Sequence, residues 1–213
     1  RIVAVAVGAV LILAGCGGGP TSDTPPGGAS PAPGRASRLV VGYDREPDTL
    51  NRFSTHILED IETCVVEGLV TTNEKMEVVP LLAASVPTVE NGGVVLRQDG
   101  GMDVTWTLRP EVKWHDGTPH TSADVKFTIM EVLKKAHPRG ISTFRDVTAV
   151  ETPDEHTAIF KLSNAAPYML AALSGYESPM LPKHVFGQGD IKSHANANSP
   201  IGTGPFKFVE WRR

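Results

Sequence analysis

Hydrophobic and polar side chains alternate most regularly in residues 104–109, VTWTLR. This period of two predicts a half-buried strand, with one apolar face and one polar face. Residues 94–97, VVLR, precede it across an Asp-Gly-Gly turn sequence, so the two segments predict an antiparallel hairpin. A second hairpin is predicted from residues 147–152 and 157–162, because they flank a Pro-Asp-Glu-His turn.

Apolar residues spaced three or four positions apart predict helices in two other segments. The first predicted helix spans residues 60–70. The second begins after Thr121, a good N-cap, with Asp124 placed to complete a capping box, and it ends at the HPRG sequence of residues 137–140. Its buried face is predicted to carry Val125, Ile129, Val132 and Leu133.

Two further strands are predicted near the ends of the globular part, in residues 38–44 and 206–211. The Asn-Gly-Gly sequence of residues 91–93 predicts a chain reversal just before residue 94. Strands and helices are mixed without a regular βαβ rhythm. The predicted class is therefore α+β, an irregular α/β arrangement.

The first residues have the pattern of a secretion signal. Arg1 precedes an uncharged apolar segment, residues 2–16, which is too short for a spanning helix and suits a signal peptide. The LAGC sequence that ends at Cys16 resembles the lipobox of bacterial lipoproteins, in which the cysteine thiol receives a diacylglycerol. We expect a signal peptide in residues 1–15 and lipid attachment at Cys16; the alternative is an ordinary signal peptide followed by a chance cysteine.

A low-complexity segment follows the predicted lipid attachment site. Half of residues 17–38 are Gly or Pro, and none has a large apolar side chain. Such a sequence cannot bury enough apolar surface to offset the entropy lost on ordering. Residues 16–38 are therefore predicted to form a disordered tether.

The charge balance argues against a nucleic-acid partner, and the cysteine count argues against a disulfide bond. The 213-residue chain has 20 basic and 24 acidic side chains, a formal net charge of -4, and its basic residues are scattered, so no nucleic-acid partner is expected. With Cys16 assigned to lipid, Cys64 is the remaining cysteine. Its apolar neighbours predict a buried, unreactive thiol, and no disulfide is expected.

His115, Asp116 and His120 form a polar cluster that raises the question of metal or acid–base chemistry. Their spacing matches no zinc-binding pattern, and adjacent residues at the end of a strand tend to point apart. The sequence also has no recognisable nucleophile motif, P-loop or dinucleotide-binding loop. We predict no metal, no cofactor and no enzymatic activity, and we interpret the cluster as a turn followed by a helix cap.

Five sequence blocks together resemble the family 5 extracellular solute-binding proteins, the receptors of ATP-driven importers for peptides, nickel and related solutes. The blocks are VVEGLVTTNEKMEVVPLLAAS, VTWTLRPEVKWHDGTPHTSADVKFTIMEVL, TAIFKLSNAAPYMLAALSG, PMLPKHVF and PIGTGPFKFVEW. They follow the family's order over nearly all of residues 39–213, and KWHDG and IGTGPF are the most recognisable pieces.

The resemblance implies a periplasmic-binding-protein-like fold of type II, with two lobes around a cleft. It assigns residues 39–52 and 163–213 to part of the first lobe, and residues 53–162 to an α+β subdomain inserted in that lobe. Family members are much longer than this chain, so we expect a partial copy in which the second lobe is absent.

The resemblance also indicates candidate ligand-binding residues. Glu46, Pro47 and Asp48 match a loop that faces the ligand in peptide-binding members; a solvent-exposed loop is the alternative. Thr203 and Gly204 either line the cleft or turn the chain into its last strand.

From these features we expect a lipid-anchored substrate-binding component of an ABC importer, a monomer on the outer face of the bacterial cytoplasmic membrane or in the periplasm. Its expected partners are a peptide or another small solute, ABC permease subunits, and the membrane through the lipid anchor. The alternative is a surface-anchored sensory or interaction module that lacks transport activity.

Overall fold

The computed structural model describes residues 39–42, 46–47, 49–51, 53 and 60–212. The chain divides into two compact units, Arg1–Asp44 and Arg45–Arg213. The predicted signal peptide, Cys16 and the predicted tether lie outside the described residues. Residues 39–42 form no strand, and Leu39, Val40 and Val41 are exposed. The strand predicted for residues 38–44 is therefore wrong over its described part, because no described strand pairs with it and an isolated strand leaves its backbone groups unpaired.

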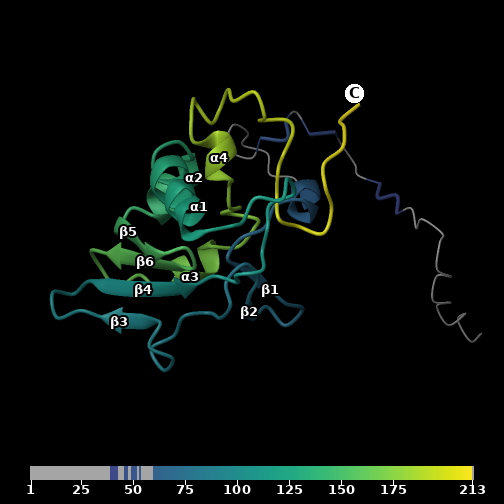
Figure 1. The fold of residues 1–213 in the computed structure, drawn as a ribbon. Helices are drawn as coiled ribbons and strands as arrows, with labels where there is room; N and C mark the ends of the chain where they lie inside the picture. Colours follow the sequence, from purple (N-terminus) through teal and green to yellow (C-terminus); the bar gives the residue numbers. More distant parts are fainter. Residues whose placement is uncertain (1–38, 43–45, 48, 52, 54–59, 213) are drawn as a thin grey trace, which may run out of the picture. The chain divides into compact units, whose positions relative to one another are not determined.

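An antiparallel four-stranded sheet forms the centre of the second unit, with strand order β3-β4-β6-β5 (Figure 1). Both predicted hairpins are confirmed. The alternation predicted for residues 104–109 is also confirmed, on β4 and just beyond it: Val104, Trp106 and Leu108 are buried, whereas Thr107 and Arg109 are exposed. The strands are β3 (Val94–Leu96), β4 (Met102–Thr107), β5 (Val147–Asp154) and β6 (Thr157–Leu162).

The second hairpin is tighter than predicted. Strand β5 continues to Asp154, so the turn is reduced to Glu155 and His156. Pro153 is accommodated because the register shifts between Glu151 and Asp154 and because β5 is an edge strand. Proline has no N–H to donate and is tolerated at bulges and edges.

A helical layer covers one face of the sheet (Figure 1). Helix α1 (Ser122–Phe127) packs on β5 and β6, and a π-helical segment, η2 (Thr128–Leu133), continues it. The predicted apolar stripe is confirmed, since all four of its residues are buried. The chain leaves the helix before residue 137 as predicted, but Pro138 then begins a new short helix, α2 (Pro138–Thr143). Proline suits a first helical position because that N–H has no intrahelical partner.

The helix predicted for residues 60–70 forms only at its start, as a 3₁₀ helix, and the prediction is wrong from residue 65 onward. A 3₁₀ turn, η1 (Asp60–Cys64), is followed by extended chain and by strand β1 (Val70–Thr72), which pairs with β2 (Val78–Pro80). Gly68 packs directly on the backbone of residues 173–175, where a Cβ atom would overlap main-chain atoms. Tertiary packing therefore overrides the helical spacing of the apolar side chains.

Two further expectations for the second unit are also corrected. Cys64 is exposed rather than buried, because it ends the 3₁₀ turn while its neighbour Val66 is the residue that packs inward. The strand predicted for residues 206–211 does not form, and Phe206 and Val209 are exposed. The main chain of that segment contacts another described segment at its start, where the Phe206 N–H donates to the Cys64 carbonyl oxygen (3.1 Å).

The remaining described helices are short: α3 (Met169–Ala172) and α4 (Lys183–Phe186), the latter packed beside α1. Within the described residues, no helix combines the length and apolar character needed to cross a bilayer. The predicted α+β class is confirmed, and the boundaries predicted at residues 52 and 162 stay predictions.

Candidate functional site

The first predicted ligand-facing loop lies against the carboxyl-terminal part of the chain. The Glu46 carboxylate accepts a hydrogen bond from the Trp211 indole N–H (3.0 Å). The side-chain oxygen of Asn198 accepts two more, from the Thr49 hydroxyl (2.7 Å) and the Leu50 N–H (2.9 Å). Asp48 lies outside the described residues. These contacts hold the loop in place, and its ligand-facing role stays a prediction.

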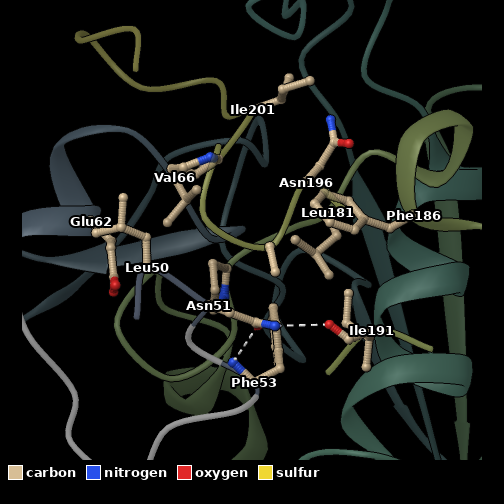
Figure 2. Close-up of a pocket in the computed structure, with 13 residues that line it drawn as sticks. Leu50, Asn51, Phe53, Glu62, Val66, Leu181, Phe186, Ile191, Asn196 and Ile201 are labelled. Carbon is tan, nitrogen blue, oxygen red and sulfur yellow. Dashed lines mark hydrogen bonds between the residues drawn. The ribbon is translucent and has the colours of Figure 1, made fainter. Parts of the chain in front are cut away.

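A small apolar pocket is lined by residues that follow this loop in the sequence, among them Leu50 and Phe53 (Figure 2). Asn51 borders it and is almost fully buried; its amide donates to the Ile191 carbonyl oxygen (2.8 Å) and accepts from the Phe53 N–H (3.1 Å). Val66, Leu181 and several other apolar side chains complete the wall. The enclosed space is about 30 Å³, which holds one or two water molecules. The pocket is therefore too small for a peptide.

The second predicted pair, Thr203 and Gly204, belongs to the IGTG loop, residues 201–204. On one side the Gly204 N–H donates to the Val65 carbonyl oxygen (2.9 Å). A Cβ atom at Gly202 would overlap the same carbonyl oxygen, so the close approach requires glycine there. The Thr203 hydroxyl oxygen is buried and has no hydrogen-bond partner within the described part of the chain.

On its other side the IGTG loop contacts His115 in the WHDG turn, residues 114–117. The His115 N–H donates to the Gly202 carbonyl oxygen (2.9 Å), and the Gly202 N–H donates to His115 Nδ1 (3.3 Å). His115 Nε2 lies 2.8 Å from the Gly204 carbonyl oxygen. The two most recognisable sequence pieces therefore bind each other, although 87 positions separate His115 from Gly202.

Asp116 connects the WHDG turn to helix α4. Its carboxylate contacts His184 Nε2 (2.7 Å) and accepts a hydrogen bond from the Thr118 N–H (2.9 Å). Partial burial opposes ionisation, but these contacts with His184 and Thr118 prevail and lower the pKa of Asp116 below its usual value. The predicted turn at Asp116-Gly117 is confirmed, since Gly117 has a φ of 94°.

Asp124 is the most heavily hydrogen-bonded carboxylate of the region, and it is 5% exposed. One oxygen accepts from the Thr121 N–H (2.9 Å), the Thr121 hydroxyl (3.3 Å) and the Trp114 indole (3.3 Å). The other accepts from the Lys183 N–H at the start of α4 (2.8 Å). The predicted capping contact between Asp124 and Thr121 is confirmed, and the link to α4 was not predicted because it depends on a residue 59 positions away.

The polar cluster is thus used for structure. His115 binds the IGTG loop, Asp116 binds His184, and His120 is buried beside Trp114, with ring centroids 5.4 Å apart. Within the part of the chain that the structure describes, no group of three or more His, Cys, Asp or Glu side chains is placed to hold a metal ion.

Comparison with known proteins identifies the family. A family model described as "Bacterial extracellular solute-binding proteins, family 5 Middle" matches residues 77–213. The chain belongs to this family. The matched part includes both the WHDG turn and the IGTG loop.

Relatives of this family 5 chain include two proteins that match it over nearly its whole length. The oligopeptide-binding protein AppA of Bacillus subtilis is 32% identical over 95% of the chain, and Protein XP55 of Streptomyces lividans is 30% identical over 99%. The chain spans 37% and 35% of the lengths of these two proteins, about a third of each.

Solved structures show the same fold. NikZ from Campylobacter jejuni, in complex with Ni(L-His), matches 79% of the family 5 chain with a TM-score of 0.62 and 28% identity, and 32% of its own length is covered. AppA from Bacillus subtilis, in complex with a nonapeptide, matches 72% with a TM-score of 0.57 and 32% identity, over 30% of its length. The expected relation to type II periplasmic-binding-protein-like folds is confirmed. These relatives are binding proteins, which agrees with the expectation that the chain is not an enzyme.

His120 gives this family 5 chain a titratable group inside its core. The ring is fully buried, and neither nitrogen has a hydrogen-bond partner within the described residues. Burial, reinforced by the nearby His156 and opposed by Asp124, lowers the pKa of His120 to about 4. The imidazole is therefore neutral in the folded protein at neutral pH.

The buried His120 predicts a loss of stability in mild acid. The unfolded chain binds a proton at this residue below about pH 6.5, whereas the folded chain does so only near pH 4, so acidification between these values favours unfolding. We expect the free energy of unfolding to fall by about 2 kcal/mol from pH 7 to pH 5 because of this group. His120→Phe keeps an aromatic ring beside Trp114 and should remove this part of the pH dependence. Urea unfolding of both proteins at several pH values measures it, and an equally steep pH dependence in the variant would contradict the assignment.

Proposed function

We propose that this chain forms part of the substrate-binding component of an ABC importer, and that the component binds peptides or a related small solute. The observation that carries the proposal is the 32% identity to an oligopeptide-binding protein over 95% of the chain. Solved relatives bind a nonapeptide, Ni(L-His) and agropinic acid, so the same fold accepts solutes of different chemistry. In this proposal the protein acts as a monomer that passes its solute to ABC permease subunits.

The proposed binding mode follows from the share of its relatives that the chain matches. Tight ligand sites bury most of the ligand surface, and the pocket at Asn51, with about 30 Å³, does not enclose a peptide by itself. The relatives are about three times as long as the matched region, so most of their polypeptide lies beyond it. We propose that residues 46–53 and the IGTG loop border one side of the solute, with the opposite side supplied by further polypeptide.

The proposed location is outside the cytoplasmic membrane, with lipid attachment at Cys16. The family description, bacterial extracellular proteins, supports an extracytoplasmic location. The LAGC sequence after an apolar segment supports the lipid anchor. Two or three acyl chains hold a protein on a bilayer durably, because each buried methylene contributes about 0.8 kcal/mol.

Solute uptake tests the proposed function. Deleting the gene from its source bacterium should reduce uptake of one labelled solute class, among peptides and nickel–histidine complexes, and the intact gene on a plasmid should restore it. Normal uptake of every solute, together with a lost transcriptional response to one of them, would contradict import and favour the sensory alternative.

Peptide titration tests the proposed one-sided binding surface. Isothermal calorimetry of the 213-residue chain with a nonapeptide should give no measurable binding at micromolar concentrations, because the chain corresponds to 37% of the length of AppA and tight sites bury most of the ligand surface. AppA of Bacillus subtilis serves as the positive control with the same peptide. Micromolar affinity of the 213-residue chain would contradict the proposal that further polypeptide is needed.

Membrane fractionation tests the proposed anchor. Cys16→Ala removes the thiol that would carry the lipid, so the protein should move from the membrane fraction to the soluble fraction. Cys64→Ala is a matched control, because Cys64 is an exposed thiol within the folded unit and the variant should stay with membranes. Retention of the Cys16→Ala variant in the membrane fraction would refute lipid attachment at this residue.

A further inference from the structure

We infer that His115 is a positioning residue whose neutral imidazole, protonated on Nε2, sets the place of the IGTG loop. Three hydrogen bonds join His115 to the main chain of Gly202 and Gly204, the residues on either side of Thr203. The consequence for solute binding rests on the proposed function, because Thr203 and Gly204 are candidate ligand-binding residues. The loop position itself does not depend on which solute is bound.

The protonation state of the ring follows from its partners. A carbonyl oxygen can only accept, so Nε2 must carry the hydrogen that is donated to Gly204. Nδ1 accepts from the Gly202 N–H and must therefore be unprotonated. A histidine in this environment satisfies one donor and one acceptor of the loop at the same time, and a charged imidazolium would lose the contact with Gly202.

The charged side chains next to His115 are engaged away from its ring. Lys207 donates to the His115 carbonyl oxygen (2.8 Å), and Asp116 contacts His184 on the far side of the turn (2.7 Å). The imidazole ring therefore binds main-chain groups of Gly202 and Gly204 and contacts neither Lys207 nor Asp116 in these interactions. These contacts are what a residue that positions the IGTG loop requires.

The IGTG loop is also held on its opposite side, by the main chain at Val65. The Gly204 N–H binds Val65, and Gly202 lies so close to the same carbonyl that no Cβ fits between them. The loop is thus held between the backbone at Val65 and the His115 ring. Removing the two ring hydrogen bonds leaves the main-chain bond from the His115 N–H to the Gly202 carbonyl oxygen (2.9 Å), so this side of the loop is weakened while the Val65 side is unchanged.

Three substitutions distinguish an effect of the His115 ring hydrogen bonds on the IGTG loop from a general effect of side-chain packing. His115→Phe keeps a planar ring but removes both ring hydrogen bonds. His115→Gln offers an amide oxygen for Gly202 and an amide N–H for Gly204, so it should restore the contacts. His184→Phe is the matched control, because it loosens the WHDG turn through Asp116 without touching the loop.

Nuclear magnetic resonance of the ¹⁵N-labelled 213-residue chain provides the test. The His115 ring should show one protonated nitrogen, Nε2, and one unprotonated nitrogen, Nδ1. Hydrogen exchange at the Gly202 N–H should accelerate about tenfold in His115→Phe and change little in His115→Gln and His184→Phe. Protonation on Nδ1, or unchanged Gly202 exchange in His115→Phe, would overturn the inference.

Uptake of the solute that the deletion experiment identifies gives a second, separate readout. His115→Phe should raise the solute concentration at half-maximal uptake, and His115→Gln should not. An unchanged half-maximal concentration in His115→Phe would overturn the consequence for solute binding. If the wild-type protein supports no uptake at all, the proposed function fails, while the resonance measurements still decide whether His115 holds the loop.

Discussion

The buried carboxyl group of Asp124 joins the WHDG turn, the start of α1 and the start of α4, and the arrangement of these three segments depends on it. Burying a carboxyl group is unfavourable unless hydrogen bonds replace the hydration that it loses. Asp124 receives these bonds from neutral donors in three places: the residue before α1, the Trp114 indole and the first N–H of α4. Because no other described group replaces them, the WHDG turn, the start of α1 and α4 must stay together for the carboxylate to remain satisfied.

The need to satisfy buried polar groups also explains why the cluster of His115, Asp116 and His120 has a structural role. His115 and Asp116 each direct a side chain to a segment far along the sequence, to the IGTG loop and to His184. His120 is enclosed near Trp114 and stays neutral because burial lowers its pKa. A catalytic or metal site would bring these groups toward one point, whereas here they diverge toward different segments.

The described part of the chain leaves Phe206 and Val209 exposed and encloses little space in the pocket at Asn51. The pocket at Asn51 encloses about 30 Å³, and a more open hollow of about 270 Å³ lies beside His115 and Ile201. Phe206 and Val209 extend from this region without a neighbouring strand among the described residues. Tight ligand sites bury most of the surface of their ligand, which the pocket at Asn51 cannot do for a peptide.

The sequence by itself determined the elements whose signals are local. The alternation in β4, the glycine turns, the Thr121–Asp124 cap and the apolar stripe of the helical layer all depend on residues a few positions apart, and each is confirmed. The family was also recognisable from the sequence, because its blocks keep their order. Only the tertiary structure decided that residues 65–70 are not helical, that residues 206–211 form no strand and that Cys64 is exposed. It alone placed His115 on the IGTG loop and Asp124 on α4, because a hydrogen bond between distant segments leaves no periodic pattern in either of them.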